Sequence, residues 1–65
     1  MKTLTTRMLF VARENAIRIA TRNAEDYIRL NPEDAERRRQ ELAIELLGIS
    51  NLYYRMLDEI KRNAG

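Results

Sequence analysis

The chain has 65 residues, of which 45% are hydrophobic and 34% charged, and its formal net charge is +2. This length allows one small domain, and the apolar content is too high and the net charge too low for a chain that is disordered throughout. The sequence contains no His and no Cys. Imidazole and thiol catalysis, disulfides and zinc sites with nitrogen or sulfur ligands are therefore excluded, and we expect no enzymatic activity, cofactor or metal ion.

The short length also limits the hydrophobic core. A single core in a chain of this size rarely contributes more than about 3–5 kcal/mol of net stability. Without disulfides or a metal ion, the remaining sources of stability are regular helix packing and self-association, which buries apolar surface that a monomer exposes. We therefore expect a homodimer.

Residues 8–12 form the longest apolar run, which Arg13 closes after five residues. The core of a secretory signal needs at least about 7 apolar residues, and a membrane span needs more. We therefore expect neither and take the cytoplasm as the default location. Residues 1–22 carry five basic residues and one acidic residue, a composition also typical of transit peptides and membrane-surface helices. An amphipathic helix on a membrane surface is therefore an alternative for this segment.

Asn31 and Pro32 divide the chain near its middle. Asn is a preferred helix N-cap and Pro suits the first helical position, while the two acidic residues that follow suit the positive end of the helix dipole. Pro32 also disfavours helical geometry at Asn31, so the preceding helix has to end at about Leu30. The sequence therefore predicts a helix over residues 3–30, a turn at 30–32 and a second helix over residues 32–62.

The first predicted helix, which Thr3 or Thr5 can open, has two faces. One sector is charged and contains Arg7, Glu14, Arg18, Arg22, Glu25 and Arg29. The opposite half contains Leu9, Ala12, Ala16, Ile17, Ala20, Ala24, Tyr27 and Ile28. Within it, the alanines at positions 12, 16, 20 and 24 form a column without bulk, which lets a second helix approach closely.

The second predicted helix has an apolar seam in which residues recur at alternating spacings of four and three. The seam consists of Leu42, Leu46, Ile49, Tyr53, Met56 and Ile60. Four further residues, Ala43, Leu47, Tyr54 and Leu57, widen it into a band that is too broad for one neighbouring helix. Part of this band should therefore face another chain.

Gly48 leaves two alternatives for the second helix. Gly inside a helix costs about 1 kcal/mol relative to Ala, whereas Gly just past a helix end is favoured. A straight helix over residues 32–62 places Ile44 and Leu52 on its polar side. A break at Gly48, with Ser50 as a new cap, aligns Leu52 with the apolar seam instead. We expect two long helices, the second with either a kink or break at Gly48 or an uninterrupted course.

These patterns predict an all-α fold, a helical hairpin of two long antiparallel helices in which residues 1–65 form one domain. We expect the hairpin to dimerise into a helical bundle. The residues predicted to form the core and the dimer contact are Leu9, Ala12, Ala16, Ala20, Leu42, Leu46, Ile49, Met56 and Ile60.

Acidic and basic residues alternate at the start of the second helix. Glu41 and Glu45 share a helix face, at a spacing that a metal ion could use. Arg37 and Arg38 precede Glu41 by four and three residues, however, which is typical of an exposed ion-pair ladder. Arg39 is expected to project toward the apolar seam, on which its long stem can lie.

The segment Ala-Ile-Glu-Leu-Leu-Gly-Ile-Ser at residues 43–50 resembles the first helix and turn of helix-turn-helix DNA-binding families, in which Leu-Gly-Ile-Ser is a frequent turn. Leu57 falls where that pattern has an aliphatic residue, whereas Ile44 and Tyr54 depart from it. The resemblance implies that the helix after Ser50 enters the major groove of DNA. The base-contacting residues that it implies are Asn51, Tyr53 and Arg55.

The expected action of the protein is binding. With no catalytic set and a surplus of helical apolar surface, the sequence predicts a small regulatory or adaptor protein that docks on another protein and changes its activity. Small phage and plasmid proteins that inhibit host factors have this size and build. The residues expected to contact the partner are Tyr53, Tyr54, Arg55, Arg18, Arg22, Arg37 and Arg38. The alternative function is a dimeric helix-turn-helix regulator that binds DNA, and no small-molecule substrate is expected.

Overall fold

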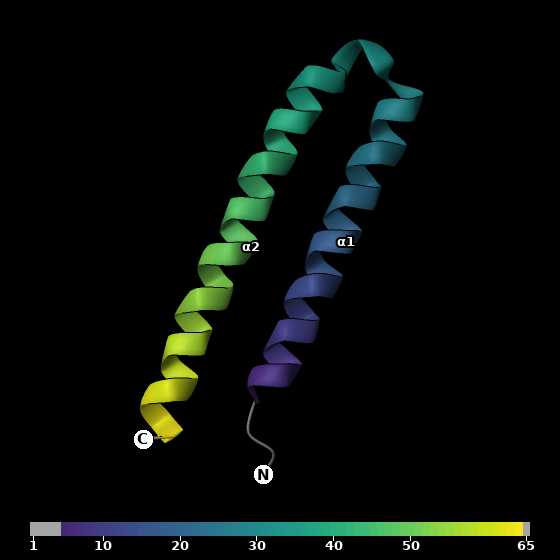
Figure 1. Cartoon of the computed structure of the whole chain (residues 1–65). Coiled ribbons are helices and arrows are strands. Elements are labelled where there is room, and N and C mark those ends of the chain that lie inside the picture. Colours follow the sequence, from purple (N-terminus) through teal and green to yellow (C-terminus); the bar gives the residue numbers. More distant parts are fainter. Residues whose placement is uncertain (1–4, 65) are drawn as a thin grey trace.

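A computed structural model of the chain describes residues 5–64 and contains two long helices joined by a short turn. Helix α1 spans Thr6–Leu30, a single 3₁₀ turn spans Pro32–Asp34, and helix α2 spans Ala35–Ala64. The helices lie side by side and run in opposite directions, so the start of α1 and the end of α2 lie at the same end of the hairpin (Figure 1). The predicted all-α hairpin is confirmed, and it is 50 Å long and 17 by 14 Å across.

Thr5 caps the N-terminus of α1. Its backbone is extended, with φ −96° and ψ 161°, and its side-chain oxygen accepts a hydrogen bond from the backbone N–H of Met8 at 3.1 Å. This bond satisfies one of the N–H groups that the first turn of a helix leaves without a partner. Of the two predicted caps, Thr5 is therefore the one observed, and Thr3 lies outside the described residues.

Asn31 closes α1 and does not cap the second helix. Its backbone N–H donates to the carbonyls of Tyr27 and Ile28, at 2.8 and 3.2 Å, and its side-chain amide donates to the Tyr27 carbonyl at 3.0 Å. It makes no side-chain cap toward Pro32–Asp34. The expected N-cap role is wrong, because the free carbonyl groups at the end of α1 lie within reach of the Asn31 amide. After the 3₁₀ turn, α2 begins only at Ala35.

Helix α2 continues through Gly48 without a break. A Cβ atom at Gly48 would meet nothing within 4 Å, so no close approach of another group requires Gly there. Of the two alternatives for the second helix, the uninterrupted one is observed. Since residues 47–50 do not form a turn, the described part of the chain lacks the two crossing helices that define a helix-turn-helix motif.

The two helices cover each other along one stripe each. All six seam residues of α2 are half-buried, namely Leu42, Leu46, Ile49, Tyr53, Met56 and Ile60. Among the residues that the structure describes, only Leu9 and Ala24 are fully buried, with 5% and 1% of their surface exposed. The predicted faces are therefore observed, but a single hairpin covers only part of its apolar surface.

The alanine column winds around α1 and does not stay on one side. Ala24 is buried, Ala20 and Ala16 are half-buried, and Ala12 is exposed. Four residues turn an α-helix by about 400°, so each step along the column rotates it by about 40°. Ala12 thus lies outside the core that the two helices share, on the flank of their contact.

Candidate protein-interaction surfaces

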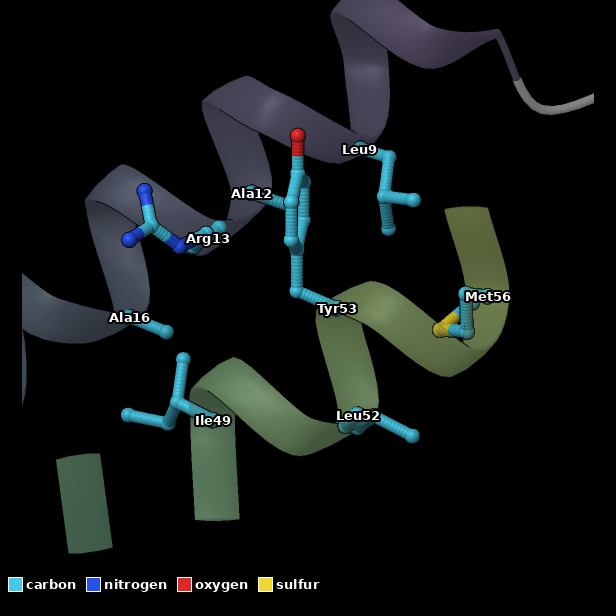
Figure 2. Close-up of a pocket in the computed structure, with 8 residues that line it drawn as sticks. All are labelled: Leu9, Ala12, Arg13, Ala16, Ile49, Leu52, Tyr53 and Met56. Atoms are coloured by element: carbon cyan, nitrogen blue, oxygen red, sulfur yellow. The ribbon is translucent and has the colours of Figure 1, made fainter. Parts of the chain in front are cut away.

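An open apolar groove lies between α1 and α2 near the free ends of the hairpin. Its lining residues are Leu9, Ala12, Arg13, Ala16, Ile49, Leu52, Tyr53 and Met56, and its volume is about 280 Å³. In Figure 2, Ile49 points toward Ala16, and the ring of Tyr53 reaches from α2 toward α1. The small side chains of Ala12 and Ala16 leave space between the helices that larger residues would fill. Leu52 is 55% exposed, so an incoming side chain can reach the groove beside it.

Arg13 is the charged residue of the groove lining. Its guanidinium carbon lies 5.1 Å from the centre of the Tyr53 ring, which is a cation–π geometry. Its Nη1 donates a hydrogen bond to Glu14 Oε2 at 2.8 Å. Its Nε is buried, and no acceptor among the described residues reaches it. The groove therefore combines an apolar surface with a partly exposed cation, and the buried Nε–H of that cation is unsatisfied.

Arg13 was not among the residues that the sequence singled out. It lies four residues after Leu9 and seven before Ala20, on the apolar side of α1. Positions separated by four or seven residues share a helix face, so this spacing was the available signal. A charged residue on an apolar helix face is covered by the neighbouring helix, and its head group has to find a partner there.

A second apolar surface lies on α2, on the flank away from the groove. It consists of Ala43, Leu47, Tyr54 and Leu57, which we call the outer band. The first three are exposed and Leu57 is half-buried. The rings of Tyr54 and Tyr53 meet edge to face, with centroids 5.1 Å apart and an interplanar angle of 73°. The residues predicted to widen the seam are thus largely left uncovered by α1.

The turn is held by three polar side chains, Tyr27, Asp34 and Arg37, which we call the turn cluster. The Tyr27 hydroxyl donates to Asp34 Oδ2 at 2.6 Å, and Arg37 Nε donates to Asp34 Oδ1 at 2.8 Å. The hydrogen bonds from Arg37 and Tyr27 lower the pKa of Asp34 from 3.8 to about 2. The hydrogen bond to Asp34 raises the pKa of Tyr27. The turn cluster joins the last turn of α1 to the first turn of α2.

The low pKa of Asp34 predicts a pH-dependent contribution to folding. A carboxyl group whose pKa is lower in the folded chain stabilises the fold above its unfolded pKa, here 3.8, and this contribution is lost as the pH falls through about 2. Between about pH 4 and about pH 2, we therefore expect the unfolding free energy to fall more for the wild type than for Asp34→Asn. Urea unfolding at each pH measures the difference. Equal pH dependence in the two proteins would contradict these hydrogen bonds.

The predicted ion-pair ladder on α2 is confirmed. Arg37 pairs with Glu41, and Arg38 Nη1 lies 2.7 Å from Glu45 Oε1 and 3.8 Å from Glu41 Oε1. Exposed ion pairs of this kind contribute little stability individually. Because Arg37 and Arg38 are paired with carboxylates of α2 itself, less of their charge is left for an external anion.

Arg39 does not lie on the seam. It is exposed, whereas the side chain of Arg38 is only 16% exposed. The expectation for Arg39 is wrong, because the covered face of α2 runs through Ala35, Arg38 and Leu42. These residues are spaced by three and four and therefore share one helix face. This face is the predicted apolar seam continued toward the turn, and Arg39, one residue further on, lies outside it.

The remaining residues predicted to contact a partner lie on separate faces. Arg18, Arg22 and Arg55 are all exposed, and Arg18 Nη2 donates to Asn15 Oδ1 at 2.7 Å. By helical geometry, the two arginines of α1 face away from α2. Of the predicted set, Tyr53 lines the groove and Tyr54 belongs to the outer band.

These features define an all-α helical hairpin with two uncovered apolar surfaces. In the part of the chain that the structure describes, no group of three or more His, Cys, Asp or Glu residues is placed to hold a metal ion. Neither helix, over the same residues, has the length and apolar character needed to cross a bilayer. No protein-family model matches the chain, and no curated protein sequence or solved structure shows a significant similarity to it.

Proposed function

We propose that this protein is a small, non-enzymatic regulatory or adaptor protein that binds another protein through the groove and changes its activity, as an inhibitor or anti-activator does. The observation that supports this proposal is the groove itself. It is open, apolar and about 280 Å³ in volume. A groove of this kind between two helices is a surface into which an amphipathic partner helix can insert apolar side chains.

The groove indicates the chemistry of its partner. An amphipathic helix that lies along two antiparallel helices inserts apolar side chains at spacings of three and four residues. Such a side chain fits between the small Ala12 and Ala16 on one side and Ile49 and Met56 on the other. A carboxylate or carbonyl oxygen next to that side chain can accept a hydrogen bond from the exposed part of the Arg13 guanidinium, whose side chain is 25% exposed, since hydrogen bonds to charged donors are the stronger ones.

We also propose that the protein acts as a homodimer, in which two hairpins form a helical bundle. A single hairpin has two buried residues among those described and a large exposed apolar surface. Self-association is the remaining source of stability for a chain of this size without disulfides.

The test of partner binding is capture from native cell extract, treated with nuclease, by the immobilised wild-type protein and two matched variants. Leu52→Lys places a charge at the groove, whereas Ile44→Lys places the same charge on the outer side of α2, where Ile44 is 69% exposed. We expect the wild type and Ile44→Lys to retain the same stoichiometric protein, and Leu52→Lys to retain about tenfold less, which corresponds to about 1.4 kcal/mol. Mass spectrometry of the bound fraction measures this.

Two outcomes would contradict the proposal. Undiminished capture by Leu52→Lys would show that the groove is not the binding surface. Recovery of DNA, with all proteins lost on nuclease treatment, would favour the DNA-binding alternative. In that case the binding should weaken steeply with salt, and Arg55→Ala should reduce it.

A further inference from the structure

A single copy of this chain exposes more surface than its mass requires. Its accessible surface is 5459 Å², whereas a compact monomer of 7.7 kDa exposes about 4,300 Å². The excess of roughly 1,100 Å² is larger than the 800 Å² or so that each partner buries in a stable interface of standard size. The area available is therefore sufficient for one further chain of this kind.

The outer band has the pattern of a second helix–helix seam. Together with Ser50, its residues occupy positions 43, 47, 50, 54 and 57, which are spaced by four, three, four and three. This is the spacing of a helix that packs along its length against an antiparallel or parallel neighbour. None of the five residues is charged. Helix α2 thus carries two adjacent seams, and α1 covers the other one.

We infer that a second copy of this chain packs its own α2 antiparallel against the outer band, across a two-fold axis next to Ser50. A two-fold interface brings the same patch of both copies together. With the axis at Ser50, Ala43 lies opposite Leu57 of the second copy, and Leu47 lies opposite its Tyr54. The small Ala43 therefore faces the larger Leu57, and Leu47 faces Tyr54, so apolar side chains fill the space between the two helices.

The groove side is less suited to self-association along its length. Its apolar part is confined to the free ends of the hairpin. Nearer the turn, the same side of α2 carries the ion pair of Arg38 and Glu45, which would have to lose water in a close contact. The assignment of the outer band as the dimer contact rests on the proposed self-association. It is independent of partner binding, because a dimer formed through the outer band leaves the groove free.

The experiment uses the absence of Cys, because a single introduced Cys then reports a single contact. A disulfide needs two Cα atoms about 4.4–6.8 Å apart, a separation that a two-fold axis at Ser50 provides. Under mild oxidation we expect Ser50→Cys to form a covalent dimer at least tenfold faster than Leu52→Cys, whose side chain lies at the groove. Non-reducing gel electrophoresis measures both rates.

A second measurement tests the same surface without a cross-link. Sedimentation equilibrium of the wild type should give twice the chain mass of 7.7 kDa. Leu47→Glu should raise the dissociation constant about 100-fold or more, because it places an unpaired charge in the contact, while Ile44→Glu should leave it unchanged. Circular dichroism verifies that both variants remain helical.

The possible failures can be told apart. A wild-type mass of one chain at all concentrations would overturn the proposed self-association. A dimer in which Leu52→Cys cross-links faster than Ser50→Cys would overturn the assignment to the outer band and place the second copy in the groove. Neither result depends on whether another protein is captured.

Discussion

Replacing Leu9 with Ala is expected to lower the free energy of unfolding by about 2–5 kcal/mol, the usual cost of deleting a buried Leu side chain. Leu9 is only 5% exposed and is one of two buried residues among those described. A chain with so small a core has about 3–5 kcal/mol of stability in total. Leu9→Ala should therefore lose about half or more of the stability of the fold, which far-UV circular dichroism during urea titration will measure.

The matched control is Leu30→Ala, the same substitution at a residue that is 79% exposed at the end of α1. An exposed side chain contributes little to packing, so this variant should lose less than about 0.5 kcal/mol. Equal losses in the two variants would mean that the first turns of α1 do not pack against α2 as described.

Replacing Ala24 with Leu should destabilise the hairpin by about 1–3 kcal/mol, because the larger side chain forces the two helices apart. Ala24 is 1% exposed, the lowest value of the two buried residues. Ala and Leu are both strong helix formers, so intrinsic helix propensity does not account for a loss of this size. The midpoint and slope of urea unfolding measure it.

The same substitution at Ala12 provides the comparison. Ala12 belongs to the same column but is exposed, so Ala12→Leu should change the unfolding free energy by less than about 0.5 kcal/mol. The two variants carry the same substitution in the same alanine column. They differ in the direction in which the substituted residue faces around α1. If Ala12→Leu is the more destabilising of the two, the winding of the column around α1 is wrong.

Both predictions depend on how closely the two helices approach, and the sequence indicated the close approach but not its extent. A run of alanines at four-residue spacing predicts a surface without bulk. The spacing of the alanines does not by itself show which part of the column packs against the neighbouring helix. The structure buries Ala24, toward the turn, and leaves Ala12 to line a groove at the free ends.

The candidate site was predicted less well than the fold. Tyr53 was expected to contact a partner and lines the groove, but Arg13 was missed and Arg39 was assigned the covered position that Arg38 holds. Such errors arise because neighbouring residues on a helix differ by about 100°. Arg38 and Arg39 lie on opposite edges of the apolar seam, so its direction alone did not show which of them the other helix covers.

The sequence by itself determined the helical hairpin. Proline at position 32 and the preceding Asn31 end the first helix, a Thr at position 3 or 5 can start it, and the apolar periodicities of both halves are strong. These are local signals, because capping, turn geometry and helical period act over a few residues. They also predicted that the apolar band of α2 is wider than one helix can cover.

Only the tertiary structure decided what each residue does at the contact between the helices. It assigned the Asn31 amide to the end of α1, kept α2 continuous through Gly48, and brought Arg13 over the ring of Tyr53. Each of these outcomes depends on the register and rotation of one helix against the other. Register and rotation follow from packing between residues far apart in the chain, which no local pattern specifies.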